Sequence, residues 1–415
     1  MDSFLIEGGL PLNGEVTISG SKNAVLPILA ATLLTSETCI IRRVPDLSDV
    51  GFMLKILQSL GAEVTQDGST LTIRAANISG RGDYELIRKM RGSICILGPL
   101  LARLKEAVVS LPGGCVIGTR PIDLHLKGLR GLGAQVEVEA GYVRVHASRL
   151  EGQMIFLGGR VGPTVLGTAN LMMAATLASG ITVIESAACE PEVVDLAGLL
   201  IAMGAKVRGA GTPTITIVGV DRLHGADYAV IPDRIEAGTF LLAAAITRSH
   251  LRISPVIPEH LGAVITKLEE AGCTIQHDGI GLTVKADRIT AVDLRTQPFP
   301  GFPTDLQAPF MSLLATAQGT SVITENIFEN RLQHVAELQR MGAAIRMQGN
   351  TAFVEGVSRL SGAPVQGSDL RASAAMVLAG LAADGITTVQ GLEFLDRGYA
   401  DFEGKLNAVG ASIRR

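Results

Sequence analysis

The stretch SLGAEV (residues 59–64) joins a predicted helix to a predicted strand, and it decides the fold because it recurs. Similar stretches follow at nearly equal spacing: GLGAQV (131–136), AMGAKV (202–207), EAGCTI (270–275), RMGAAI (340–345) and AVGASI (408–413). A glycine just after a helix supplies the left-handed conformation of a C-cap. We therefore predict that each glycine of this series closes a helix, namely Gly61, Gly133, Gly204, Gly272, Gly342 and Gly410. Successive glycines lie 68 to 72 residues apart, which indicates six repeats of one supersecondary unit.

Each repeat follows the same order of elements. A hairpin comes after the glycine, as in EVTQDGSTLTI (63–73) and TIQHDGIGLTV (274–284), where apolar and polar residues alternate around a turn. A further strand and a helix rich in alanine and leucine follow, as in AGTFLLAAAI (237–246). Such helices are apolar nearly all round, so we expect them to be buried inside the sheets. A second helix then leads to the next glycine.

The repeats also predict how the chain divides into domains. With 415 residues, the chain is too long for one ordinary core. The sixth repeat has no return strand after AVGASIRR, whereas SFLIEGG (3–9) resembles the return strands of other repeats. We therefore expect an α/β protein of two domains with three repeats each. One is discontinuous, formed by residues 1–20 and 230–415, and the other is continuous, formed by residues 21–229 with a lid loop at 111–121.

Composition excludes several classes of function. Aromatic residues make up 4% of the chain, tryptophan is absent and the net charge is -4, so nucleic acid is not an expected partner. The five cysteines form no C-x-x-C pair, which is typical of free thiols in the cytoplasm. We see no signal peptide, no apolar segment long enough to span a membrane and no metal or phosphate-loop motif. A cytoplasmic protein without a metal or cofactor is the expectation.

One position of the repeat, at or near the start of each buried helix, holds a charged residue in five of the six repeats. These positions hold Lys22, Arg91, Thr164, Arg234, Asp305 and Arg371. Cations oppose the dipole at a helix N-terminus, so we expect them to serve an anionic ligand with carboxylate or phosphate groups. Asp305, the anion of the series, is a candidate general base, although it could simply cap its helix, as could Thr304. Arg234 could equally be an ion-pair partner of Glu236 or Asp233.

The loop SLPGGCVIGTRP (110–121) holds a candidate reactive group. Clustered glycine and proline indicate a loop, and Cys115 lies five residues before Arg120. A thiol beside a cation can become a reactive thiolate. It can also be an ordinary packed residue, as we expect of Cys39, Cys95, Cys189 and Cys273.

Seven segments together carry a resemblance to a known family. They are SGSKNA (19–24), PGGCVIGTRPIDLHLKGL (112–129), PDRIEAGTF (232–240), FPTDLQAPF (302–310), ENIFENR (325–331), DLRASAA (369–375) and LDRGY (395–399). With them the chain resembles the UDP-N-acetylglucosamine 1-carboxyvinyltransferases, which are enolpyruvyl transferases. The resemblance implies an inverted α/β prism and transfer of the enolpyruvyl group of phosphoenolpyruvate to the 3′-hydroxyl of UDP-N-acetylglucosamine, without a metal or cofactor. It also implies a role in peptidoglycan synthesis, cell shape and cell division, and inhibition by fosfomycin.

The resemblance further implies roles for individual residues. Lys22, Arg120 and Arg397 would hold phosphoenolpyruvate, Asn23 would contact the sugar, and Arg91 and Arg371 would complete a cationic cleft. Asp305 would accept the proton of the sugar hydroxyl, and Cys115 would donate one to the enol carbon as the lid closes. The nucleotide would meet Arg120, Pro121, Ile122, Asp123, Leu124 and Ile327. Arg331 is a further substrate-binding candidate, although it could instead play a structural role.

One segment departs from the family pattern. In GGRVGPTVLGTAN (158–170), Leu166 replaces a glycine and Ala169 replaces a glutamate of the family. We expect Gly162, Pro163, Thr164 and Val165 to face the diphosphate there. Three other functions stay open at this point: transfer to 3-phosphoshikimate, transfer to another nucleotide, and a repeat scaffold that binds partners without catalysis.

Overall fold

The computed structural model describes residues 2–113, 117–118, 121–160 and 162–415. By their contacts, these residues form two compact units. The middle unit comprises residues 20–113 and 121–231, and the terminal unit comprises residues 2–19, 117–118 and 232–415.

Within its described residues, the middle unit surrounds its inner helices with the sheets β13-β3-β5-β4, β6-β8-β7 and β11-β12-β10-β9. The strands are β3 (Thr38–Arg42), β4 (Glu63–Asp67), β5 (Thr70–Arg74), β6 (Glu106–Ser110), β7 (Gln135–Glu139), β8 (Tyr142–His146), β9 (Met154–Phe156), β10 (Ile181–Glu185), β11 (Lys206–Arg208), β12 (Thr214–Val218) and β13 (Asp227–Ala229). The helices, with η marking short 3-10 segments, are α1 (Lys22–Ala31), η1 (Thr32–Leu34), α2 (Ser48–Ser59), α3 (Tyr84–Ile87), η2 (Arg91–Ile96), α4 (Leu97–Leu104), α5 (Asp123–Gly131), α6 (Val165–Ala175) and α7 (Pro191–Ala202).

The terminal unit repeats this plan with the sheets β15-β16-β14-β2, β17-β18-β20-β19 and β22-β24-β1-β25, and it adds the pair β21-β23. Its strands are β1 (Ser3–Glu7), β2 (Asn13–Thr17), β14 (His250–Ser254), β15 (Thr274–His277), β16 (Leu282–Lys285), β17 (Leu294–Arg295), β18 (Thr320–Thr324), β19 (Ala344–Gln348), β20 (Thr351–Glu355), β21 (Leu360–Ser361), β22 (Pro364–Gln366), β23 (Ala383–Asp384), β24 (Ile386–Gln390) and β25 (Ser412–Arg414). Its helices are α8 (Arg234–Ile246), η3 (Pro258–Leu261), α9 (Gly262–Glu270), η4 (Thr304–Leu306), α10 (Gln307–Leu314), α11 (Val335–Arg340), α12 (Leu370–Ala382), α13 (Leu392–Leu395) and α14 (Phe402–Ala408).

The first two strands of the chain enter two different sheets of the terminal unit. Strand β1 pairs antiparallel with both β24 and β25, so that Leu5 lies opposite Thr388 on one side and Arg414 on the other. Its residues Phe4 and Ile6 point into the core and are fully buried. Strand β2 runs parallel to β14 in a neighbouring sheet, a pairing that the repeat pattern did not predict.

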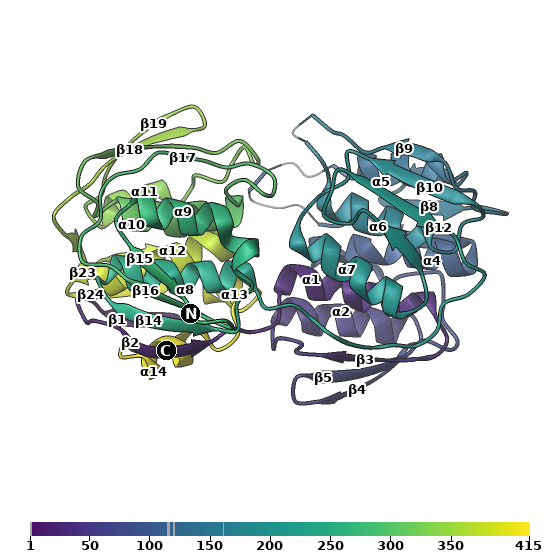
Figure 1. Cartoon of the computed structure of the whole chain (residues 1–415), viewed down its shortest axis with the longest axis horizontal. Coiled ribbons are helices and arrows are strands. Elements are labelled where there is room, and N and C mark those ends of the chain that lie inside the picture. The colour runs from purple at the N-terminus through teal and green to yellow at the C-terminus, as the bar shows by residue number, and fades with distance from the viewer. Residues whose placement is uncertain (1, 114–116, 119–120, 161) are drawn as a thin grey trace. The chain divides into compact units, whose positions relative to one another are not determined.

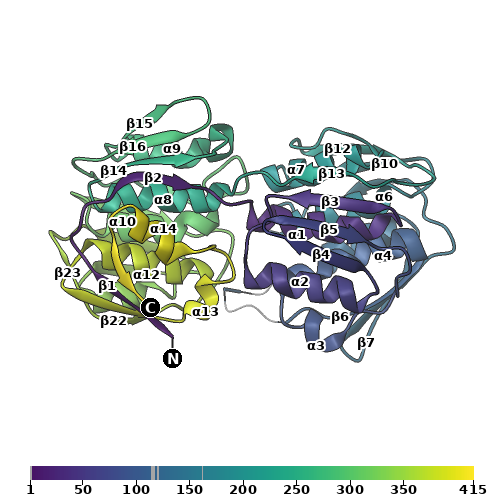
Figure 2. The same cartoon turned by 90° about the horizontal axis from the view of Figure 1, so that it is seen from below.

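Buried helices form the centre of each unit, as predicted from their composition. In the terminal unit α8, α10 and α12 lie against one another with the sheets around them (Figures 1 and 2), and every residue of α8 is buried. Small residues allow the close approach: a Cβ atom added at Gly238 would lie 2.4 Å from Leu306 Cδ1. In the middle unit, α6 is buried in the same way. This arrangement is the predicted inverted α/β prism.

The repeated glycines close their helices as predicted. All six have positive φ, from 91° at Gly342 to 107° at Gly410. The small residue after each glycine donates its N–H to a leucine carbonyl five residues earlier, for example Ala62 to Leu57 at 3.0 Å and Ala411 to Leu406 at 3.1 Å. This six-to-one hydrogen bond is the Schellman motif, which satisfies a carbonyl at the helix end.

Two of these glycines give a matched test. Both Gly272 and Gly342 lie in the terminal unit with positive φ. A Cβ atom added at Gly272 would lie 2.8 Å from the Arg288 carbonyl oxygen, whereas a Cβ atom added at Gly342 would have no other atom within 4 Å. We expect Gly342→Ala to lower the free energy of unfolding by about 1 kcal/mol through backbone strain alone. Gly272→Ala should cost clearly more, because the carbonyl must also move. Urea unfolding of both variants measures the difference, and equal losses would contradict it.

Candidate functional site

Side-chain caps begin several of the inner helices. Ser21 Oγ accepts from the Ala24 N–H in α1 (3.4 Å), and Thr164 Oγ1 accepts from Gly167 N–H in α6 (3.2 Å). Asp233 caps α8 and Asp369 caps α12. These caps satisfy N–H groups of the first turn, so the cations that follow them are not needed for helix stability. The predicted charged residues do lie at helix N-termini, whereas the caps were missed, although a Ser, Thr or Asp before each helix signalled them.

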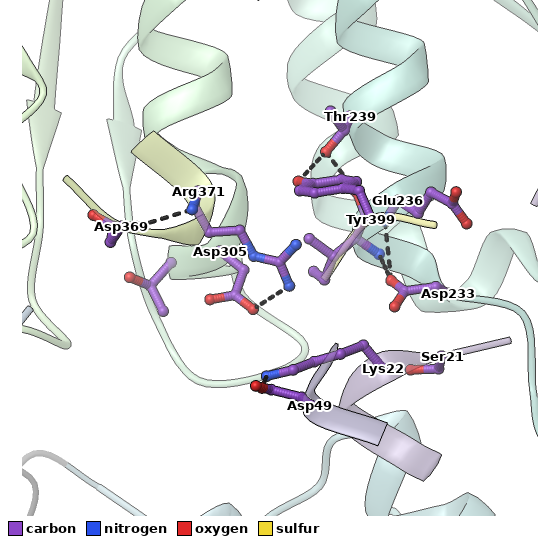
Figure 3. Close-up of polar contacts among 12 residues, drawn as sticks. Ser21, Lys22, Asp49, Asp233, Glu236, Thr239, Asp305, Asp369, Arg371 and Tyr399 are labelled. Carbon is purple, nitrogen blue, oxygen red and sulfur yellow. Dashed lines mark hydrogen bonds and ion pairs between the residues drawn. The ribbon is translucent and has the colours of Figure 1, made fainter. Parts of the chain in front are cut away.

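In the terminal unit, one carboxylate bridges two guanidinium groups. Asp305 Oδ1 accepts from Arg331 Nη2 at 2.8 Å, and Asp305 Oδ2 accepts from Arg371 Nη2 at 3.0 Å. The arginine side chains are only 5% and 2% exposed, whereas that of Asp305 is 23% exposed. Two adjacent cations favour the ionised form of the carboxylate. Sequence reasoning placed Asp305 and Arg371 at helix N-termini but did not predict their contact, shown in Figure 3.

Unmet hydrogen-bond donors surround this ion pair. Arg371 Nε, Arg371 Nη1 and Arg331 Nε are buried and have no partner among the described residues. Burial alone would lower the pKa of Arg371, but Tyr399, Asp305 and Asp233 raise it above its ordinary value. Burial lowers the pKa of nearby His334 to about 4, so its imidazole is neutral at pH 7. Buried charged donors without acceptors suit an anionic ligand.

Glu325 holds the loops around Asp305 in place, a role that sequence reasoning missed. Its buried carboxylate accepts from the hydroxyls of Thr296 and Thr304, both at 2.9 Å. It also accepts from the backbone N–H of Ile327 (2.7 Å) and of Phe328 (3.2 Å). The Thr304 hydroxyl therefore donates to Glu325. The sequence also allowed Thr304 to cap its helix, but no side-chain cap is present there. The segment ENIFENR contained the residue, but its spacing gave no sign of these partners.

The other terminal-unit candidates lie near this network. Ile327 is half-buried beside Glu325, and the Arg331 guanidinium lies over the ring of Phe328, 5.3 Å from its centroid. Arg397 follows α13 and is half-buried. The adjacent Asp396 pairs with Arg415 at 2.7 Å. The Arg234 guanidinium lies over Phe299, while Glu236, one of the partners considered for it, binds Lys405 at 2.6 Å.

In the middle unit, the first turn of α1 presents two candidates. Lys22 Nζ lies 3.3 Å from Asp49 Oδ2, and the Asp49 side chain is buried. Asn23 follows Lys22 in the same turn, and Arg91 begins η2; all three candidates are half-buried. Asp49 thus gives Lys22 a fixed partner that the repeat pattern did not reveal.

The candidates for nucleotide contact in the middle unit lie at the start of α5 and in the turn before α6. Gly159 and Gly162 exchange backbone hydrogen bonds of 2.9 and 3.3 Å, which makes a tight turn before α6. Leu124, at the start of α5, packs on this turn, because a Cβ atom at Gly159 would lie 2.8 Å from Leu124 Cδ1. The candidates near this turn include exposed Pro121 and Asp123, buried Ile122, and half-buried Gly162, Pro163, Thr164 and Val165. Cys115 and Arg120 lie outside the described residues.

A buried polar junction supports this region. The Asn170 amide donates to His125 Nδ1 (2.9 Å) and to the Ile94 carbonyl (2.9 Å), and its oxygen accepts from Gly98 N–H (2.8 Å). Because an amide nitrogen only donates, Nδ1 of His125 is the acceptor and the ring carries its proton on Nε2. His125 is packed in the core, and this junction ties α4, α5 and α6 together.

The described cysteines are not candidates for nucleophilic chemistry. Cys39, Cys95 and Cys273 are buried and Cys189 is partly buried. Burial raises the pKa of the Cys95 thiol to about 12 and that of Cys273 to about 11, which keeps both protonated at neutral pH. Across the described ranges, no group of His, Cys, Asp or Glu side chains is arranged to hold a metal ion, and no helix is long and apolar enough to cross a bilayer.

The fold, with cationic side chains at helix starts in both units, is that of a class of protein, the carboxyvinyltransferases. The sequence profile of the family described as EPSP synthase (3-phosphoshikimate 1-carboxyvinyltransferase) matches residues 6–406. The chain belongs to this family.

Within it, the chain is similar to proteins named UDP-N-acetylglucosamine 1-carboxyvinyltransferase. That of Synechococcus sp. (strain CC9605) is 56% identical over 99% of this chain and 95% of its own length. That of Gloeobacter violaceus is 57% identical over 100% of this chain and 91% of its own length. Among solved structures, the enolpyruvyl transferase NikO from Streptomyces tendae superposes with a TM-score of 0.90 at 26% identity, covering 99% of this chain and 98% of that one.

The Glu325 network generates a prediction on stability. In Glu325→Gln the remaining oxygen still accepts from Thr296, Ile327 and Phe328, and the new amide can donate to the Thr304 hydroxyl. We expect this variant to lose about 1 kcal/mol of unfolding free energy. Glu325→Ala leaves all four donors without an acceptor and should lose about 3 kcal/mol or more. Urea unfolding of both variants measures this, and a similar loss in the two would mean that the four hydrogen bonds contribute little.

Proposed function

We propose that this protein transfers the enolpyruvyl group of phosphoenolpyruvate to the 3′-hydroxyl of UDP-N-acetylglucosamine and releases phosphate, the first committed step of peptidoglycan synthesis. The observation that carries the proposal is the 56–57% identity, over nearly the whole chain, to relatives with that name. The reaction needs one site for a small, multiply charged anion and one for a nucleotide sugar. The buried guanidinium groups of the terminal unit and the turn beside α5 are suited to these two tasks.

In the proposed reaction, a bond forms between the sugar 3′-oxygen and C2 of phosphoenolpyruvate while C3 gains a proton. The resulting tetrahedral intermediate then loses a proton from C3 and its phosphate group, which restores the double bond. Asp305 accepts the proton of the sugar hydroxyl, a role supported by its partly exposed carboxylate between two arginines. Cys115 supplies the proton to C3, and closure of the loop 111–121 excludes water from the intermediate.

Cationic groups hold the anionic substrate in this proposal. Lys22, Arg120 and Arg397 bind phosphoenolpyruvate, with Lys22 near its phosphate, and Arg371 and Arg91 add positive charge. The buried, unpartnered Nε and Nη1 of Arg371 support an anion there. Arg331 also contacts Asp305 directly, so its role includes holding the base as well as substrate.

The nucleotide sugar meets a second set of residues. Asn23 contacts the sugar, Arg120, Pro121, Ile122, Asp123 and Leu124 line the uridine site, and Ile327 contacts the nucleotide sugar. Gly162, Pro163, Thr164 and Val165 face the diphosphate; packing of Leu124 on the turn at Gly159 supports one common region for the middle-unit members of this set. The four described cysteines are free thiols, which supports a reducing compartment such as the cytoplasm.

Phosphate release tests the proposed reaction and its base. The wild-type protein should release phosphate from phosphoenolpyruvate in the presence of UDP-N-acetylglucosamine, and not with 3-phosphoshikimate or UMP in its place. Asp305→Asn keeps the shape of the side chain but removes the base, so we expect turnover to fall by about 10²-fold or more. Asp287→Asn is the matched control, because that carboxylate is 81% exposed in the same unit. Near-normal activity of Asp305→Asn would refute the assignment of the base.

Fosfomycin tests the role of Cys115. A thiolate at this position should open the epoxide and form one covalent adduct, with parallel loss of activity. The other cysteines should not react, because burial raises the pKa of Cys39, Cys95, Cys189 and Cys273. Intact-mass measurement should therefore find a single adduct on the wild type and none on Cys115→Ser. An unmodified wild type, or an adduct that persists in Cys115→Ser, would exclude a reactive thiol at this position.

A further inference from the structure

A buried tyrosine lies behind the Asp305–Arg371 ion pair and has no role in the function proposed above. Tyr399 follows α13, and its hydroxyl lies 2.9 Å from Thr239 Oγ1 on α8. Both residues are buried, at 3% and 0% exposure. The ring packs against Phe402 at the start of α14, with centroids 4.7 Å apart. Figure 3 shows Tyr399 beside Thr239 and Arg371.

The hydrogen-bond geometry fixes the direction of the tyrosine O–H group. Thr239 Oγ1 lies 2.8 Å from the Ile235 carbonyl oxygen, which can only accept, so Thr239 must donate its single proton there. The proton shared between Thr239 and Tyr399 therefore comes from Tyr399. The Tyr399 hydroxyl oxygen keeps its lone pairs on the side away from that bond. If the O–H group turned away, the hydrogen bond to the buried Thr239 Oγ1 would be lost.

The face of the same ring carries the guanidinium group of Arg371. The guanidinium carbon lies 5.2 Å from the ring centroid, which is within the range of a cation–π contact. The Arg371 guanidinium therefore lies over the Tyr399 ring and donates from Nη2 to Asp305. Its Nε and Nη1 remain buried without a partner, so this edge of the guanidinium is the part left for a ligand.

We propose that Tyr399, with its hydroxyl fixed by Thr239, is a positioning residue that orients the Nε and Nη1 edge of Arg371 toward an anionic oxygen of phosphoenolpyruvate. The inference rests on the proposed function, because it assigns that substrate to this edge. Tyr399 itself does not touch the substrate. It acts by fixing the plane of a group that would otherwise lose order when its Asp305 partner takes part in proton transfer.

Electrostatics agree with this arrangement. Although burial acts to lower it, the pKa of Arg371 is raised above its ordinary value, with Asp305 and Asp233 among the causes, so the side chain remains charged in its buried position. Burial raises the pKa of Tyr399, which keeps the phenol protonated and able to donate to Thr239. The positioning contact is therefore between a permanent cation and a neutral phenol.

Steady-state kinetics separate this role from a general structural one. We expect Tyr399→Phe to lower kcat/KM for phosphoenolpyruvate about 10-fold and Tyr399→Leu, which also removes the ring, about 100-fold. In both, KM for phosphoenolpyruvate should rise while KM for UDP-N-acetylglucosamine stays within about twofold of the wild-type value. Thr239→Val should reproduce Tyr399→Phe, and the double variant should be no worse than either. Thr239→Ser keeps the hydroxyl and should stay within about twofold of the wild type.

Ser312→Ala is the matched control for loss of a buried hydroxyl. Ser312 joins α10 to the Ala375 carbonyl of α12 at 2.9 Å and is fully buried. Its removal should lower Tm but leave both KM values unchanged. If Tyr399→Phe behaves like Ser312→Ala, with a lower Tm and unchanged KM values, or keeps wild-type kcat/KM, the proposal is wrong.

A readout that needs no turnover keeps the two proposals distinct. In protein labelled with ¹⁵N-arginine, the Nε–H resonance of Arg371, identified by its absence in Arg371→Lys, should be protected from exchange in the wild type. It should broaden or lose protection in Tyr399→Phe and Thr239→Val but not in Ser312→Ala. An unchanged resonance in Tyr399→Phe would overturn the positioning role. Loss of order together with an inactive wild type would refute the proposed function, and with it the assignment of phosphoenolpyruvate to this edge, while the ordering of Arg371 by Tyr399 would stand.

Discussion

Complete burial of the inner helices is the constraint on which the rest of the structure depends. A helix that is surrounded by sheets and neighbouring helices offers no side to a ligand. Only its ends can reach one, and the N-terminal end already carries a partial positive charge. In both units the candidate residues are accordingly gathered at helix starts, such as Lys22 on α1 and Arg371 on α12. The interior then requires small and apolar residues, which accounts for the composition of α8.

At these helix ends one residue caps the helix while a neighbouring residue carries the charge of the site. Asp369 accepts from the first N–H groups of α12, and this leaves the Arg371 side chain available for Asp305. Asp305 in turn depends on Glu325, which fixes the adjacent Thr304 through a buried hydrogen bond. Removing solvent from such a cluster strengthens each of its ion pairs and makes every unpaired donor costly. The same desolvation that threatens stability therefore prepares the cluster for an anion.

Local sequence pattern predicted some of these features and not others. The repeated glycines, the apolar helices and the recurring charged position follow from spacing along the chain, and the structure has them as expected. The contact of Asp305 with Arg331 could not be predicted, because nothing in the repeat spacing relates these two residues. Asp305 and Arg371 share the recurring repeat position, but that pattern does not predict a direct contact between their side chains. The role of Glu325 and the parallel pairing of β2 with β14 were missed for the same reason. Pairings of this kind arise from packing of whole repeats, which periodicity does not describe.

The position of β1 between β24 and β25 has a consequence for biosynthesis. A strand near residue 5 cannot find its neighbours until the ribosome has made nearly four hundred further residues. The middle unit has its sheets encoded within one continuous stretch and can fold while translation proceeds. In the terminal unit, β2 can pair once β14 has been made, but β1 stays unpaired until β24 and β25 emerge. Until synthesis reaches the last repeat, the nascent chain therefore carries a strand whose backbone N–H and C=O groups have no partner strand.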